Sequence, residues 1–270
     1  MAWIRFGARL LLREPAARGQ FIAEFETEGP APDADPGQFV QLALPGAFWP
    51  RPFSLLDWRL VGGVARFQIL FAVVGNATRA LEMLPIGSRI EGHGPLGRGF
   101  PTPSGPTWLI AGGYGVAPLL FSMRRAPDPP ASQIRLFYGA GTRDLLWQGD
   151  ELIRRQVAFC TDDGSLGQPG TVLDAVRVEL DAAATRPTLY SCGPMGLLDA
   201  VAALAASSGL QALVSIETLM PCGMGVCRGC AVPLSEARAS EAQRYVMACE
   251  EGPVMDSRGV NWEMERACRL

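Results

Sequence analysis

The sequence predicts a multidomain protein with an N-terminal antiparallel β-barrel, a central α/β domain on a parallel sheet and a small cysteine-rich C-terminal domain. Three observations support this fold class: short apolar runs broken by Gly and Pro in the first third, alternating strand and helix patterns in the middle, and clustered cysteines near the end. A chain of 270 residues has room for roughly two domains of ordinary size, and the third is small. We expect the domains to cover 1–102, 103–210 and 211–270.

The composition is that of an ordinary globular protein, and the net charge of −3 gives no indication of a nucleic-acid partner. The sequence contains no Lys, so a side-chain cation that contacts a phosphate must be Arg. Arg5, Arg9 and Arg13 interrupt the apolar N-terminal stretch, and we expect no signal peptide. Prolines break the uncharged run from Gly99 to Met123, which excludes a membrane helix there. The expected location is a reducing cytoplasm. In that compartment, seven cysteines indicate metal binding rather than disulfide bonds.

The cysteine-rich segment has the spacing Cys222-x4-Cys227-x2-Cys230, with Cys249 further along the chain. This is the plant-type spacing of a [2Fe–2S] cluster, in which one loop supplies three thiolates and a distant segment supplies the fourth. Three interleaved glycines allow the loop to adopt positive φ angles and to turn its amides towards the sulfurs. Tetrahedral zinc is the alternative metal. Structural zinc sites more often use two C-x2-C pairs, whereas this segment has only one. The other cysteines lie outside this spacing: Cys160, Cys192 and Cys268.

The first third contains two candidate phosphate-binding segments. Arg51 lies at the start of a strand, and with Ser54 it could bind a pyrophosphate group. Residues 75–78 precede a helix expected from Thr78, whose first amides would face the same group. An Arg-Pro pair beside a strand also occurs for purely structural reasons. The glycine-rich segment from Gly92 to Phe100 is predicted to be a turn.

The middle third has the strand–turn–helix pattern of a nucleotide-binding domain. A buried strand from Trp108 to Ala111 is followed by a glycine turn and a helix expected from Val116. A parallel sheet places ligands at the carboxyl ends of its strands. Glycines in the turn would let a dinucleotide diphosphate approach the backbone, although such a turn also occurs without a ligand. These candidates are Gly112, Gly113 and Gly115, with Cys192, Gly193 and Pro194 at a second strand end.

Four motifs occur here in the order in which ferredoxin reductase-like flavoproteins carry them. They are Arg51-Pro52-Phe53-Ser54, Gly94-Pro95-Leu96-Gly97, Gly112-Gly113-Tyr114-Gly115 and Cys192-Gly193-Pro194. With the cysteine loop and the segment CEEGPVMDSRGVNW, the whole chain resembles the electron-transfer subunits of the two-subunit, NAD-dependent dihydroorotate dehydrogenases of pyrimidine biosynthesis. The cysteine loop is the most specific part of this resemblance, because many reductases share the glycine turns.

The resemblance implies FAD, a [2Fe–2S] cluster and NAD as cofactors. The positions that match the family's FAD motifs are Arg51, Pro52, Phe53, Ser54, Leu70, Phe71, Ala72, Gly75, Ala77 and Thr78. This sequence departs from the family at Ala72, where an Arg is common, and at Ala77, where a Gly is common. It also reads CGPMGL where the nicotinamide motif usually reads CGPxPM. The resemblance puts Cys192 near the nicotinamide, and the alternative is a buried small residue.

Electron transfer from NADH to such a cluster requires no side-chain acid or base, because the cofactors supply the chemistry. Asp162 and Asp163 either help to place the nicotinamide or ribose or are turn residues, and His93 is interpreted as an ordinary loop residue. The three domains leave no room for a substrate-oxidising barrel, so the resemblance implies a hetero-oligomer with an FMN-containing catalytic subunit. Two alternatives remain: the electron-entry subunit of a hydrogenase or sulfide-type oxidoreductase, and a zinc-containing binding module.

Overall fold

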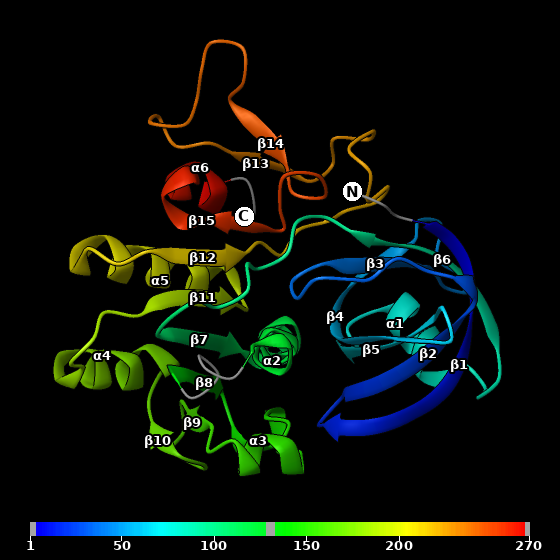
Figure 1. The fold of residues 1–270 in the computed structure, drawn as a ribbon, viewed down its shortest axis with the longest axis horizontal. Coiled ribbons are helices and arrows are strands. Elements are labelled where there is room, and N and C mark those ends of the chain that lie inside the picture. Colours follow the sequence, from blue (N-terminus) through cyan, green and yellow to red (C-terminus); the bar gives the residue numbers. More distant parts are fainter. Residues whose placement is uncertain (1–3, 128–132, 268–270) are drawn as a thin grey trace.

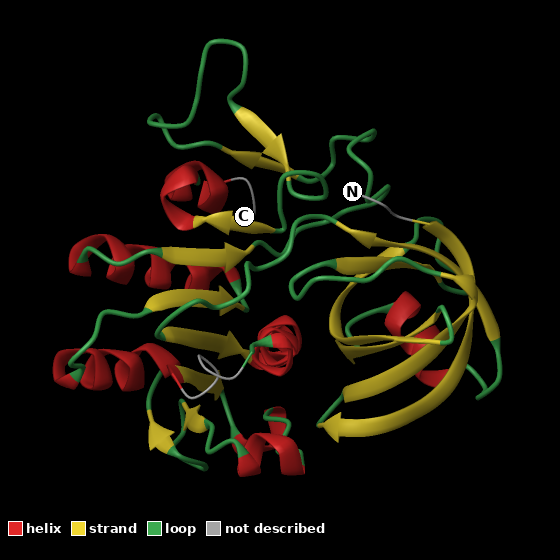
Figure 2. Ribbon diagram, in the orientation of Figure 1, coloured by secondary structure: helices red, strands yellow, loops and turns green. Residues whose placement is uncertain are grey.

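The computed structural model describes residues 4–127 and 133–267. A β-barrel and an α/β sheet lie side by side, and loops of the C-terminal segment lie across one end of both (Figure 1). Figure 2 shows that most helices belong to the α/β part, whereas the barrel carries one.

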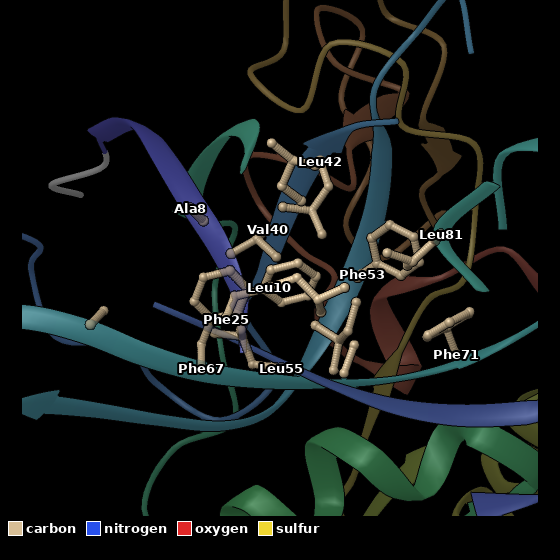
Figure 3. Close-up of a cluster of buried hydrophobic side chains, with 14 of the residues drawn as sticks. Ala8, Leu10, Phe25, Val40, Leu42, Phe53, Leu55, Phe67, Phe71 and Leu81 are labelled. Atoms are coloured by element: carbon tan, nitrogen blue, oxygen red, sulfur yellow. The ribbon is translucent and has the colours of Figure 1, made fainter. Parts of the chain in front are cut away.

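The barrel is closed, antiparallel and ordered β1-β2-β5-β4-β3-β6. Its elements are β1 (Ile4–Ala17), β2 (Gln20–Pro30), β3 (Phe39–Ala43), β4 (Arg51–Val61), β5 (Val64–Ala72), α1 (Asn76–Met83) and β6 (Arg89–Leu96). The ring of Phe25 stacks on that of Phe67, with centroids 5.2 Å apart (Figure 3). The ring of Trp58 also stacks on Phe67, at 5.4 Å. Leu81 of α1 is fully buried in the same core, so the helix packs into the barrel. The first turn of the helix lies near the rim.

The second sheet has the order β10-β9-β8-β7-β11-β12-β15. Its strands are β7 (Thr107–Gly112), β8 (Ile134–Ala140), β9 (Ala158–Thr161), β10 (Gln168–Pro169), β11 (Thr188–Cys192), β12 (Ala212–Ser215) and β15 (Val254–Asp256). All neighbouring pairs are parallel except β12 with β15. The carboxyl ends of the parallel strands therefore share one edge, as the alternating sequence pattern predicts.

Helices cover both faces of this sheet. They are α2 (Val116–Arg125), α3 (Asp150–Arg154), α4 (Val172–Ala182) and α5 (Met195–Ser208), with short 3-10 turns η1 (Gly113–Gly115), η3 (Arg143–Leu145) and η4 (Ser257–Gly259). Helix α2 packs between the sheet and the barrel (Figure 1). At its C-terminal end, Arg124 and Arg125 donate to the carbonyl oxygens of Leu56 and Trp58 on β4, at 3.0 and 2.9 Å. Helix α2 therefore joins the two parts.

The C-terminal segment contributes to the sheet and also forms its own small unit. Strands β13 (Ala231–Pro233) and β14 (Tyr245–Met247) pair antiparallel, and α6 (Trp262–Ala267) packs near β13. Strands β12 and β15 extend the large sheet although both follow residue 211. The sheet thus continues across the expected boundary, and the division into 1–102, 103–210 and 211–270 stays a prediction.

Most expected elements are present, with two differences. The strand at Trp108 and the helix at Val116 agree with β7 and α2, whereas α1 begins at Asn76, two residues before the expected start. The expected turn from Gly92 is wrong in its first half, because β6 continues to Leu96. A Cβ on Gly92 would lie 2.7 Å from the Phe6 ring and 2.8 Å from a backbone oxygen of β3, so this glycine permits close packing within a strand. Among the described helices, none is long and apolar enough to cross a membrane.

Candidate functional site

A cavity of about 760 Å³ lies where the barrel meets the sheet. Every barrel position singled out for FAD lines it: Arg51, Pro52, Phe53, Ser54, Leu70, Phe71, Ala72, Gly75, Ala77 and Thr78. The sheet side contributes Gly115 and Cys192, whereas Gly112, Gly113, Gly193 and Pro194 are not part of the lining. A third wall, residues 215–220, leads from β12 into the cysteine loop. Three parts of the chain therefore enclose one space.

The apolar floor of the cavity comes from β4 and β5. The ring of Phe53 meets that of Phe71 edge-on, with centroids 6.2 Å apart, and Leu70 lies beside them in the lining. Both phenylalanines belong to the barrel core, which fixes their positions (Figure 3). An apolar lining with a few polar groups at the rim is the usual form of a site for an aromatic cofactor.

The polar rim contains Arg51 and the first turn of α1. Arg51 is exposed, and its Nη1 donates to the backbone oxygen of Trp49 at 2.8 Å. Thr78 Oγ1 accepts from the amides of Val74 and Gly75 at 3.0 and 3.1 Å, which orders the turn before the helix. A cation and a helix start that share one rim can bind a diphosphate.

The glycine turn after β7 and the Cys192 turn after β11 touch through their backbones. A Cβ on Gly115 would lie 2.4 Å from the carbonyl oxygen of Cys192, and a Cβ on Gly112 would lie 2.8 Å from Pro194 Cδ. Only glycine fits at Gly115, so α2 begins directly beside the end of β11. The structure therefore brings together the two turns that the sequence analysis singled out.

Cys192 is buried at the sheet side of the cavity. Burial raises the pKa of its thiol to about 12, and the charge of Glu217 acts in the same direction. The thiol is therefore neutral at physiological pH. A neutral buried thiol can pack against a ring without competing as a nucleophile.

Tyr114 and Glu217 also line the cavity, and sequence reasoning did not single them out. Tyr114 Oη donates to Glu217 Oε1 at 2.8 Å. Burial, followed by the charge of Glu217, raises the pKa of Tyr114 well above its ordinary value. Tyr114 stands inside the glycine turn, so its place in that motif was the available signal. Glu217 had none, because its partner lies 103 residues away.

The cysteine loop carries backbone donors directed at its sulfurs. The amide of Gly225 donates to Cys249 Sγ at 3.0 Å, and the amides of Cys227 and Gly229 donate to the sulfurs of Cys222 and Cys227 at 3.4 Å. Positive φ angles at Gly223 and Gly225, +70° and +76°, allow this path. The glycine-rich loop therefore turns amides towards sulfur, as the sequence predicts.

Cys230 and Cys249 form the buried half of the set, with sulfurs 3.3 Å apart. The hydrogen bond between the two sulfurs lowers the pKa of Cys230. Cys222 is half-buried and Cys227 is exposed. Within 4–127 and 133–267, no three His, Cys, Asp or Glu side chains gather closely enough to hold a single metal ion. Cys268 lies outside the described residues.

The remaining predicted candidates lie away from the cavity or act through the backbone. Asp163 Oδ1 accepts from the amide and hydroxyl of Ser165 at 2.9 and 2.6 Å, the geometry of a turn. Asp162 is exposed in the same loop. The interpretation of His93 as a loop residue is wrong: it stands in β6, and its Nε2 lies 3.1 Å from the carbonyl oxygen of Cys222.

Comparison with known proteins is decisive for the family. Residues 217–261 match the iron–sulfur cluster binding domain of dihydroorotate dehydrogenase B. The chain is 35% identical over 265 residues to a dihydroorotate dehydrogenase B (NAD(+)) electron transfer subunit from Desulforamulus reducens, with 96% of this chain and 98% of the relative covered. The chain belongs to this family of electron transfer subunits. A homologous subunit from Caldanaerobacter subterraneus is 30% identical over 94% of this chain and 97% of its own.

A solved structure extends the family assignment to the fold. An NADH-dependent reduced ferredoxin-NADP oxidoreductase, studied for flavin-based electron bifurcation, superposes with a TM-score of 0.80 and 26% identity over 97% of this chain and 93% of its own. The ferredoxin reductase-like fold and the resemblance to dihydroorotate dehydrogenase electron transfer subunits are thus confirmed. The matched iron–sulfur domain and this fold also agree with FAD, [2Fe–2S] and NAD as the cofactors.

Proposed function

We propose that this chain carries electrons between NAD(H) and an FMN-containing catalytic subunit that oxidises dihydroorotate in pyrimidine biosynthesis. One observation carries the proposal: the cavity between barrel and sheet shares the wall of residues 215–220 with the start of the cysteine loop. A nicotinamide, a flavin and a cluster would then lie in that order along one short path. FAD, when bound, converts the two-electron chemistry of NADH into the single-electron chemistry of a cluster.

The cavity residues fit FAD. Arg51 and the turn before α1 would hold its diphosphate, because they supply a cation and backbone amides at the rim. Phe53, Leu70 and Phe71 would support its ring from the apolar floor. Residue 72 is an alanine, so this chain lacks the flavin contact of the arginine that is common in the family at this position.

The sheet edge fits the nicotinamide nucleotide. Gly112 and Gly115 let their turn approach the Cys192–Pro194 turn closely, so the two backbones lie side by side at the strand ends. In parallel sheets this edge is where dinucleotides bind. Cys192 lines the cavity from there, and its neutral thiol would lie against the nicotinamide.

The cysteine loop fits the cluster. Cys222, Cys227, Cys230 and Cys249 would be its ligands, and amide donors already reach three of these sulfurs. Such donors stabilise thiolates and raise the reduction potential of a cluster. A reducing cytoplasm is the proposed location, because thiolates that ligate a cluster must not be oxidised to disulfides.

The surface beside the cysteine loop supports a hetero-oligomer. Leu219 and Val226 are 80% and 78% exposed, and Met224 is also exposed. Exposed apolar residues grouped around a redox site indicate a protein interface. Met220, in the same segment, is buried beneath the loop, so the patch consists of its neighbours.

Purification with the catalytic subunit tests the proposal. We expect bound FAD, about two iron atoms and two labile sulfides per chain, and NAD-dependent dihydroorotate oxidation only in the presence of both subunits. Zinc without flavin would contradict the proposal. The similarity to the NADH-dependent oxidoreductase favours a second candidate, an electron-entry subunit of another redox complex. Copurification with a different flavoprotein, and no activity with dihydroorotate, would support that candidate instead.

A further inference from the structure

We propose that Gln41 and His93 of the barrel are positioning residues that hold the start of the cysteine loop and fix Cys222 beside the cavity. This inference rests on the proposed function, because it assigns Cys222 to the cluster. Neither side chain belongs to a cofactor motif, and neither lines the cavity.

The two side chains come from neighbouring strands and reach the same stretch of loop. Gln41 of β3 pairs with His93 of β6 in the antiparallel ladder, and directly opposed residues project on the same face. Gln41 Nε2 donates to the carbonyl oxygen of Met220, and His93 Nε2 lies 3.1 Å from that of Cys222. The barrel therefore holds two carbonyls that flank Pro221.

The next residue of the loop packs directly on the same strands. A Cβ on Gly223 would lie 2.8 Å from Gln41 Cγ and 2.9 Å from Leu96 Cδ1. The loop can approach this closely only because residue 223 is glycine, and its φ of +70° favours glycine as well. Hydrogen bonds and close packing thus act on the loop segment from Met220 to Gly223.

The contact continues into a shared apolar core. Phe39 and Leu96 of the barrel belong to one buried cluster with Met220, Cys230 and Cys249 of the C-terminal segment. Two members of the cysteine set, Cys230 and Cys249, therefore share this core with the barrel strands. A shift of the barrel surface here would move the ligands relative to the flavin cavity.

The chemistry of Gln41 points to a specific role. Its side chain is fully buried, and its Oε1 has no hydrogen-bond partner among the described residues. An unpaired buried carbonyl group is destabilising, so an apolar side chain would suit packing alone better. The hydrogen bond from Gln41 to the carbonyl oxygen of Met220 therefore explains why residue 41 carries an amide. A trans peptide directs its N–H opposite to its carbonyl. With the Cys222 carbonyl held by His93, the Gly223 amide faces away from β6.

The test compares Gln41→Met and His93→Phe with two controls. The first control, Gln68→Met, removes a half-buried glutamine of β5 whose amide donates a hydrogen bond to Glu24 on β2. The second control, His93→Gln, keeps a hydrogen-bond donor that can reach the carbonyl oxygen of Cys222. The measurements are iron release to a chelator, the electron paramagnetic resonance spectrum of the reduced cluster, FAD content and thermal unfolding.

We expect Gln41→Met and His93→Phe to release iron about 10- to 100-fold faster than wild type, with a shifted spectrum and unchanged FAD content. Gln68→Met should match wild type, and His93→Gln should restore most of the stability of the cluster. Wild-type iron release and spectrum in both test variants would overturn the inference, as would equal losses of FAD and cluster in all four variants. Wild type without iron would overturn the proposed function itself, and this inference with it.

Discussion

Tyr114 Oη donates a hydrogen bond to Glu217 Oε1 at 2.8 Å, and this bond links the glycine turn after β7 to the segment that enters the cysteine loop. Both residues line the cavity beside Cys192. The bond therefore connects the proposed nicotinamide side of the site to the segment that leads to the proposed cluster. Its position makes Tyr114 the first residue to change.

Tyr114→Phe should slow the bleaching of FAD by NADH about fivefold, because an ordinary hydrogen bond contributes about 1 kcal/mol. Stopped-flow absorbance at the flavin wavelength measures this. Tyr245→Phe is the matched control, since Tyr245 is exposed on β14 and is not part of the cavity lining. Equal rates in the Tyr114 and Tyr245 variants would exclude a role for the bond.

The raised pKa of Tyr114, which burial causes first and the charge of Glu217 second, predicts how the wild-type rate depends on pH. The folded-state pKa of Tyr114 is raised above its ordinary value of 10.0, so the folded protein keeps this proton where an unfolded chain loses it. The stabilisation from Tyr114 is therefore full below pH 10 and is lost only as the pH rises through the higher folded value. Tyr114→Phe should not alter the pH profile of bleaching between pH 7 and pH 10. A wild-type inflection near pH 9 that the variant lacks would contradict this.

Arg51→Ala should weaken FAD binding while the cluster remains. One charge-assisted contact to a phosphate contributes about 1.5–3 kcal/mol, which corresponds to about a 10- to 100-fold increase in Kd. Fluorescence of released flavin measures Kd, and iron content reports the cluster. Arg59→Ala, on the same strand but paired with Asp57 at 3.0 Å, should leave FAD binding unchanged. Equal flavin loss from both variants would show a general effect on the strand.

Cys227→Ser should abolish the [2Fe–2S] cluster, because serine cannot supply the thiolate that iron prefers. Cys160→Ser is the matched control, since Cys160 is buried in the sheet on β9, away from the loop. Iron and acid-labile sulfide are measured in both. The ligand assignment is wrong if the Cys227 variant keeps its cluster while the Cys160 variant loses it.

Local patterns predicted much of this molecule. The spacing of Cys222, Cys227 and Cys230 identified the cluster loop, and the Arg51 motif identified the segment that lines the cavity. These patterns work because each motif folds largely within itself. The barrel and the parallel sheet were likewise visible in short periodicities.

The contacts missed by the sequence analysis all join distant segments. His93 meets Cys222 across 129 residues, and Gln41 meets Met220 across 179. A strand pattern shows that Gln41 is in a strand, but not which loop its amide will reach. Gly92 was misread for the same reason, since its role depends on Phe6 lying opposite. Tertiary packing decided these positions.

The chain should use NADH in preference to NADPH. Asp162 and Asp163 are exposed in the loop after β9, and a hydrogen bond from Ser165 lowers the pKa of Asp163, so this loop is anionic at neutral pH. An acidic residue suits a ribose 2′-hydroxyl, whereas a 2′-phosphate requires cations. Arg143 is the nearby exception, with its amide bonded to Ser165 Oγ at 2.8 Å. Flavin bleaching by the two nucleotides tests the preference, and Arg143→Ala should lower only the NADPH rate. Faster bleaching of wild type by NADPH would contradict it.

Reduction of FAD and reduction of the cluster should be separable. The Arg51 and Gly115 segments line the cavity, whereas Cys230 lies outside its lining, in the core beneath the cysteine loop. Cys230→Ser should therefore remove the cluster and leave bleaching of FAD by NADH within about twofold of wild type, since Cys230 itself is not part of the cavity lining. Electron delivery to the catalytic subunit should cease. Stopped-flow absorbance at flavin and cluster wavelengths, with dihydroorotate oxidation as the second assay, distinguishes the steps. A Cys230→Ser protein that still holds FAD but can no longer be bleached by NADH would contradict the order NADH, FAD, cluster, because the cluster would then be needed before the flavin.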